Sequence, residues 1–245
     1  MAYKFMIDIT MTASIRPDVI IRTLESIGTN ITYRPLRLIV DISHVGEVHK
    51  YSQDYCIEVI KNCCTQYGID LVYRKLPLSL QAEALKWTWS KADTDFVLQW
   101  EDDWVLLQKI DITVLMQLMN KHQFGMLYLD RYKKSVVDYP GYKGVFNKLT
   151  NNTYVRIKGK SLGGPPALLK KEYIKAVLPL IKDEVCLDTI SPTKEVQEVL
   201  KNWSIGVYYH TKGNLVKDIG KEWKERNNLI MRKNTKVGVQ WIKKN

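Results

Sequence analysis

The chain has 245 residues, of which 45% are hydrophobic and 26% are charged. These ordinary globular values exclude a disordered chain, a collagen and a small disulfide scaffold. No apolar run approaches the 18 residues of a membrane-spanning helix, and the first residues lack the apolar segment and cleavage site of a signal peptide. We therefore expect a cytoplasmic protein, located in the host cytoplasm if a phage encodes it.

The formal net charge of +11 is unevenly distributed along the chain. Residues 1–104 contain 11 Lys and Arg against 14 Asp and Glu, a net charge of −3. Residues 105–245 contain 26 Lys and Arg against 12 Asp and Glu, a net charge of +14. We expect the second half to face a polyanion such as DNA, an anionic lipid surface or a phosphorylated glycan. A Lys-rich surface without such a partner is the alternative.

The first hundred residues alternate between strand and helix patterns. Strands are predicted where apolar and β-branched residues run together, and helices where apolar residues recur at helical spacing. The predicted strands are 3–11, 36–42, 69–74 and 95–100, and the predicted helices are 16–27, 49–67 and 79–92. Such a β-α-β-α-β-α-β series predicts a mostly parallel sheet with right-handed crossovers.

The second half is less regular. Residues 131–152 are rich in Tyr, Lys, Gly and Asn, which favours a loop or a short hairpin. The predicted helices are 112–122, 171–181, 193–202 and 218–226, and the predicted strands are 124–129, 153–158 and 204–209. No internal repeat or low-complexity linker divides the chain, so one continuous α/β domain is predicted.

Three of the four cysteines, Cys56, Cys63 and Cys64, are spaced i, i+7, i+8, which places them on one face of a helix. We expect buried, reduced thiols there. A zinc site is not expected, because the sequence has no Cys-x2-Cys and its four histidines are scattered.

Ligands of an open parallel sheet bind outside the carboxyl ends of its strands. Thr12, Ser14 and Arg16 follow the first predicted strand, Asp41 closes the second, and residues 101–103 follow the fourth. No Gly-x-Gly-x-x-Gly follows the first strand and no Walker motif is present, which disfavours a dinucleotide or P-loop site.

The segment Trp100-Glu101-Asp102-Asp103-Trp104 is the sharpest feature of the sequence. Three adjacent carboxylates repel one another and need compensation. Alternate residues of an extended backbone project the same way, so Glu101 and Asp103 are expected to share one cation while Asp102 points elsewhere. Oxygen ligands suit Mg2+ or Mn2+. An acidic turn is the alternative, although flanking tryptophans are unusual for one.

Four segments, in this order, resemble those of GT-A glycosyltransferases, particularly the family-2-like ones. They are the loop 12–17, Asp41 at the end of a strand, the Ala-rich helix 82–89, and the strand 95–104 that leads into Glu-x-Asp where the family has DxD. The resemblance covers residues 3–104. It implies a single GT-A (Rossmann-like) α/β domain, with a nucleotide-sugar half at 1–104 and a mixed, acceptor-binding half at 105–245.

The resemblance also implies a metal-dependent transfer of a sugar from a nucleotide diphosphate, most simply a UDP-sugar, with Mn2+ or Mg2+ at Glu101 and Asp103. The sequence departs from the family at 76–78 and at Lys86, where many members carry Asn-x-Gly and Asn, so those donor contacts are not carried over. The residues of the first half expected to bind the nucleotide sugar are Thr12, Ser14, Arg16, Asp41 and Asp102.

In the second half, His210 ends a predicted strand and is expected to be a further metal or phosphate ligand, as in many GT-A enzymes; a structural histidine is the alternative. Lys212 is expected to contact the diphosphate. The glycine-containing loop 162–167 is expected to face the donor sugar and acceptor.

An inverting enzyme needs a general base. Glu195 and Asp188 are the candidates, followed by Glu198, with helix capping as the competing role of Glu195. A retaining enzyme would need no such base, and the sequence leaves the choice open.

Two acceptors are compatible with the basic second half. One is a hydroxymethylated base in double-stranded phage DNA, contacted by residues 131–160 and the tail 221–245. The other is a lipid-linked or lipopolysaccharide acceptor, reached through peripheral membrane contact. A non-enzymatic nucleic-acid-binding protein and a metal-dependent nuclease or phosphotransferase are further alternatives.

Overall fold

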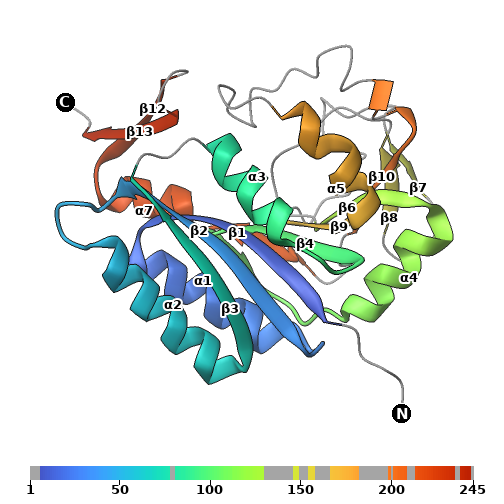
Figure 1. Ribbon diagram of the computed structural model, residues 1–245, viewed down its shortest axis with the longest axis horizontal. Helices are drawn as coiled ribbons and strands as arrows, with labels where there is room; N and C mark the ends of the chain where they lie inside the picture. Colours follow the sequence, from blue (N-terminus) through green and yellow to red (C-terminus); the bar gives the residue numbers. More distant parts are fainter. Residues whose placement is uncertain are drawn as a thin grey trace.

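The protein is built on a nine-stranded sheet of order β3-β2-β1-β4-β9-β6-β10-β8-β7 (Figure 1). The computed structural model describes residues 6–77, 81–129, 146–148, 154–157, 166–181, 198–199, 201–208, 213–234 and 238–243. The strands of this sheet are β1 (Ile7–Ile15), β2 (Leu36–Gly46), β3 (Ile69–Leu76), β4 (Phe96–Glu101), β6 (Phe124–Leu129), β7 (Phe146–Lys148), β8 (Tyr154–Ile157), β9 (Ala167–Lys170) and β10 (Ser204–Tyr208).

The first four strands form a parallel unit. β1 pairs in parallel with β2 on one side and with β4 on the other, so Thr12 lies opposite both Asp41 and Glu101. β9 then runs antiparallel between β4 and β6, and β10 returns parallel to β6. The predicted α/β domain with a mostly parallel central sheet is confirmed.

Helices cover both faces of the sheet (Figure 1). α1 (Pro17–Asn30), α2 (Gln53–Tyr67) and α4 (Ile112–His122) pack in one core with the side chains of one face, including Leu38 and Leu98. α3 (Gln81–Lys91) and α5 (Lys171–Val177) pack in the other core with Ile39 and Val97. Adjacent strand residues enter opposite cores because side chains alternate along a strand. None of the helices in the described ranges is long and apolar enough to cross a membrane.

Local sequence explains where the helices begin and end. α2 starts after Ser52, whose hydroxyl accepts a hydrogen bond from the backbone N–H of Tyr55. It ends at Gly68, which has a left-handed φ of 62° that glycine adopts without steric cost. The three cysteines of α2 are buried and unpaired, as predicted. Burial raises the pKa of the Cys56 thiol to about 11 and that of Cys64 to about 12.

A buried carboxylate stabilises the amino end of the parallel strands. Asp8 of β1 accepts two hydrogen bonds from Arg37 of β2, at 2.7 and 2.9 Å, and others from the backbone N–H groups of Asp93 and Thr94. Burial would raise the pKa of Asp8, but these hydrogen bonds and the Arg37 charge outweigh it and hold that pKa below its ordinary value.

Several elements differ from the sequence-based predictions. β1 continues to Ile15 and β2 to Gly46, beyond the predicted ends. The structure also contains short strands that the hydrophobic periodicity of the sequence does not predict. Each has only three to six residues, which is too few for a clear periodic pattern, and pairs with a distant or later segment. Besides β9, they are β5 (Trp104–Leu106), which pairs with β11 (Val216–Asp218), and the hairpin of β12 (Leu229–Asn234) and β13 (Gly238–Lys243).

The C-terminal segment returns to the carboxyl ends of the parallel strands. Helix α7 (Gly220–Arg226) and the β12–β13 hairpin lie at this end of the sheet in Figure 1, away from the start of β1. A short helix over 218–226 was predicted and is present from Gly220. The predicted helix 193–202 lies mostly outside the described residues.

Candidate functional site at the carboxyl edge of the sheet

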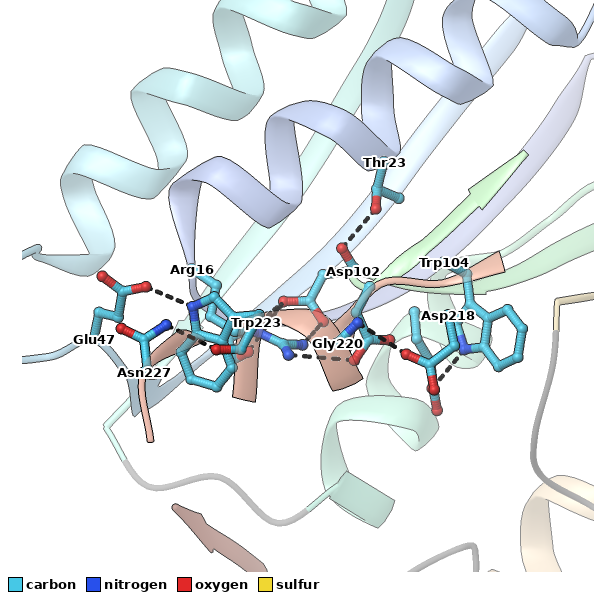
Figure 2. A network of polar contacts seen from close by, with 12 residues as sticks. Arg16, Thr23, Glu47, Asp102, Trp104, Asp218, Gly220, Trp223 and Asn227 are labelled. Atoms are coloured by element: carbon cyan, nitrogen blue, oxygen red, sulfur yellow. Dashed lines mark hydrogen bonds and ion pairs between the residues drawn. The ribbon is translucent and has the colours of Figure 1, made fainter. Parts of the chain in front are cut away.

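The acidic segment lies at the carboxyl end of β4, against the end of β1. The N–H of Asp102 donates to the carbonyl oxygen of Thr12 at 3.2 Å, and the hydroxyl of Thr23 in α1 donates to the carbonyl oxygen of Asp102 at 2.7 Å. β1 ends at Ile15 and α1 begins at Pro17, so Arg16 alone connects them. Strand, helix and acidic segment therefore meet at this point (Figure 2).

Asp102 and Arg16 form a buried ion pair, each side chain with only 4% of its surface exposed. Arg16 donates from Nη2 to Oδ1 and from Nε to Oδ2, and Ser14 donates to Oδ2 from its N–H at 2.9 Å and its hydroxyl at 3.0 Å. Burial alone would lower the pKa of the Arg16 guanidinium, but the charges of Asp102 and Asp103 outweigh it and raise that pKa. The charge of Arg16 is thus fixed at all accessible pH values.

Asp103 and Glu101 remain nearer the surface than Asp102. Oδ2 of Asp103 accepts a hydrogen bond from Nη1 of Arg16 at 3.2 Å, and 19% of the Asp103 side chain is exposed. Oε2 of Glu101 accepts from Nε1 of Trp104 at 3.3 Å. Residues 102 and 103 lie in a turn and not on an extended strand, and both carboxylates accept from the Arg16 guanidinium, so the predicted alternation does not describe them. The shared cation at Glu101 and Asp103 stays a prediction. Within the described ranges, no three His, Cys, Asp or Glu side chains form a cluster able to hold a metal ion.

Asp41, in the middle of the adjacent strand β2, is fully buried and has an unusual hydrogen-bonding state. Its Oδ2 accepts from Nε of Arg74 at 2.6 Å, whereas its Oδ1 has no hydrogen-bond partner. Burial raises the pKa of Asp41, and Arg74 offsets this only in part. Arg74 also lies over the ring of Trp87, 4.8 Å from its centroid. Sequence reasoning missed Arg74, whose only signal is its position opposite Asp41 in the β2–β3 register.

The C-terminal segment supplies a second group of residues that sequence reasoning missed. Trp223 of α7 is 2% exposed, and the centroid of its ring lies 5.1 Å from the guanidinium carbon of Arg16. Its Nε1 donates to Oε1 of Glu47 at 2.6 Å (Figure 2). Asp218 accepts from the N–H of Gly220 at 2.8 Å. Burial, and then the negative charge of Asp103, raise the pKa of Asp218.

Several predicted site residues lie outside the described residues, so their roles stay predictions. They are Asp188, Glu195, His210, Lys212 and nearly all of the loop 162–167. The structure brings together Thr12, Ser14, Arg16, Asp41 and residues 101–103 at one edge of the sheet, and their contacts with a ligand also stay predictions.

Comparisons with known proteins bear on the fold. No protein-family model and no curated protein sequence matches the chain. Solved structures do match. Residues 1–349 of S. aureus TarS, in complex with UDP, superpose with a TM-score of 0.54 at 12% identity, covering 84% of this chain and 60% of that one. The mannosyltransferase PcManGT from Pyrobaculum calidifontis, in complex with GDP-Man and Mn2+, gives a TM-score of 0.59 at 12% identity, covering 86% and 58%.

A second class of enzyme matches over a larger share of its own length. The CMP:2-keto-3-deoxy-manno-octonic acid synthetase complexed with CTP has a TM-score of 0.54 at 10% identity, covering 91% of this chain and 97% of that one. This chain thus spans about 60% of the matched glycosyltransferases and nearly all of the synthetase. The domain has the α/β fold shared by GT-A glycosyltransferases and sugar nucleotidyltransferases.

Proposed function

We propose that the protein is a metal-dependent glycosyltransferase that moves a sugar from a nucleoside diphosphate to an acceptor hydroxyl. The observation that carries this proposal is the sorting of the three carboxylates after β4. Asp102 is buried on Arg16, whereas Glu101 and Asp103 stay partly exposed beside the end of β1. In a nucleotide-binding α/β sheet this edge is where the phosphates of a ligand lie.

The chemistry of these residues fits a divalent cation. Mg2+ and Mn2+ prefer carboxylate oxygens, and such ions commonly take one or two carboxylates and complete their coordination with phosphate oxygens and water. Glu101 and Asp103 would hold the ion, while Asp102 is committed to Arg16. A bound divalent cation would neutralise charge on the departing diphosphate.

The β1–α1 junction favours glycosyl over nucleotidyl transfer. Binding a triphosphate for nucleotidyl transfer is well served by a glycine-rich loop whose backbone N–H groups surround the phosphates. Here the connection is the single residue Arg16, and its guanidinium is turned inward onto Asp102 and Asp103. The segment 12–17 contains no glycine.

Asp41 and Arg74 support a uracil base in the donor. Uracil presents one N–H donor between two carbonyl acceptors. A carboxylate oxygen in need of a donor and a neighbouring guanidinium are complementary to that edge. Asp41 Oδ1, which is buried in this structure, and Arg74 would provide this pair once the base displaces the groups that cover the carboxylate. Thr12 lies beside Asp41 in the adjacent strand. We therefore propose UDP-sugar as the donor.

For the acceptor, we propose a polyanion recognised by the basic second half, with DNA carrying a hydroxymethylated base favoured over a lipid-linked glycan. The support is the net charge of +14 in residues 105–245. In an inverting reaction Glu195 or Asp188 would take the proton from the acceptor hydroxyl. Acceptor affinity for DNA would fall steeply with salt, whereas affinity for a lipid-linked acceptor would depend on anionic vesicles.

Nucleotidyl transfer is the second candidate, favoured by the near-complete coverage of the synthetase. One assay separates the two reactions. Purified protein with Mn2+ is given either a panel of UDP-sugars or UTP plus sugar 1-phosphates, and the products are UDP and pyrophosphate respectively. We expect slow UDP release from one UDP-sugar, abolished in Asp103→Ala. Release of pyrophosphate alone would replace the proposal by nucleotidyl transfer.

A further inference from the structure

The C-terminal segment contacts the acidic site directly. The N–H of Ile219 donates to the carbonyl oxygen of Asp103 at 2.8 Å, and the N–H of Leu107 donates to the carbonyl oxygen of Leu215 at 2.8 Å. β11 pairs with β5, the strand that immediately follows the acidic residues. Val19, Val105, Ile219 and Trp223 pack in a small buried cluster of their own. Residues 215–223 are therefore fixed to the segment that carries Asp103.

Gly220 leaves room for that carboxylate. A Cβ atom on Gly220 would lie 2.1 Å from Oδ2 and 2.9 Å from Cγ of Asp103, far inside van der Waals contact. Gly220 begins α7 and does not have a positive φ, so its backbone conformation is open to any residue. Glycine is also a poor helix former. The space taken by Asp103 is thus the physical reason for glycine at position 220.

Trp223 restrains the same carboxylate through Arg16. The indole lies against the guanidinium, and its hydrogen bond to Glu47 fixes the plane of the ring (Figure 2). Arg16 in turn donates to Oδ2 of Asp103. The position of Oδ2 is therefore defined by its contacts with Gly220 and with Arg16, which Trp223 holds.

We propose that Gly220 and Trp223 are positioning residues, which set the orientation of the Asp103 carboxylate for donor binding from the far end of the chain. The proposal rests on the proposed donor site at Asp103. It assigns to α7 a role in the donor half of the protein, although α7 lies in the half expected to bind the acceptor. An error of about 1 Å in a binding group can reduce activity 100-fold, so this restraint has functional weight.

The test is a double-mutant cycle between Gly220→Ala and Asp103→Ala, read by thermal unfolding without ligand. Gly220→Ala should lower the Tm in the wild-type background and lower it clearly less in the Asp103→Ala background, because the carboxylate atoms at 2.1 and 2.9 Å are then absent and only the Cβ of residue 103, at 3.1 Å, remains close. Equal Tm losses in both backgrounds would overturn the proposal. This readout needs no nucleotide, so it stands even if the proposed donor is wrong.

Affinity for UDP in Mn2+ tests the functional part. We expect Gly220→Ala and Trp223→Leu to weaken it about 10- to 100-fold, and Trp223→Phe, which keeps a ring over Arg16, to weaken it less. The matched control is Gly28→Ala, whose Cβ would lie 2.2 Å from the Tyr67 ring, away from the site. The control should lose Tm but bind UDP normally. Normal UDP binding by folded Gly220→Ala would overturn the positioning role, whereas failure of the wild type to bind would overturn the proposed function itself.

Discussion

Removal of the Arg16 charge would leave Asp102 as an unpaired carboxylate in the interior. In Arg16→Met the side-chain volume is largely kept, but Asp102, with 4% of its side chain exposed, retains only the two hydrogen bonds from Ser14. Breaking a buried ion pair by removing one partner typically costs about 3–5 kcal/mol. For a domain of this size each kcal/mol corresponds to about 2–4 °C, so the Tm should fall by roughly 6–20 °C.

The control for this prediction removes both charges. In Arg16→Met/Asp102→Leu no buried charge is left, and replacement of a buried ion pair by apolar residues is often close to neutral. Part of the loss should remain, because the N–H of Ser14 then lacks its acceptor. Free energies of unfolding would be measured by urea titration followed by far-UV circular dichroism. A loss below about 1 kcal/mol in Arg16→Met, or a larger loss in the double variant, would refute the reasoning.

Three further predictions follow from buried titratable groups. Because the pKa of Asp8 is lowered in the folded protein, its ionised carboxylate stabilises the fold above its unfolded pKa, and this stabilisation is lost as the pH falls through the folded pKa. Urea titrations should therefore show that Asp8→Asn costs stability at neutral pH and progressively less below about pH 4. A loss of stability that does not change with pH would contradict this. Burial raises the pKa of Cys56 to about 11 and that of Cys64 to about 12, so few of these thiols are ionised in the native protein. They should react with a disulfide reagent at least about 100-fold faster in urea than in the native protein. Equal rates would show that the native thiols are accessible. Because the pKa of Asp41 is raised, acidification should protonate Asp41 and weaken UDP binding at a higher pH than it would for an exposed aspartate. The variant Asp41→Asn cannot ionise, so calorimetry should show that it binds UDP weakly at every pH.

The parallel half of the fold could be predicted because its signals are local. Each of its strands and helices is a continuous pattern, and the alternation of the two types implies parallel pairing without knowledge of partners. The exception is the end of β1, where Thr12 and Ser14 have the polar character of a loop. Ser14 continues the strand because its N–H and hydroxyl are both satisfied by Asp102.

The residues that shape the site from a distance could not be predicted in the same way. Arg74 is one charged residue in an edge strand, and only the strand register places it against Asp41. Trp223 lies in a short helix near the end of the chain, and its contact with Arg16 depends on the β5–β11 pairing, which spans only three residues on each strand. Such contacts follow from tertiary arrangement, which a sequence pattern does not encode.

The most direct test of a metal-dependent UDP-sugar site is thermal unfolding with UDP, with Mn2+ and with both together. A ligand at about 100 times its dissociation constant adds roughly 2.7 kcal/mol, which predicts a rise in Tm of about 5–10 °C for this chain length. We expect that rise in the wild type only when both ligands are present. It should be lost in Asp103→Ala and kept in Asp70→Ala, which removes an exposed carboxylate of the edge strand β3. A wild type whose Tm does not respond to UDP with Mn2+ would contradict the account.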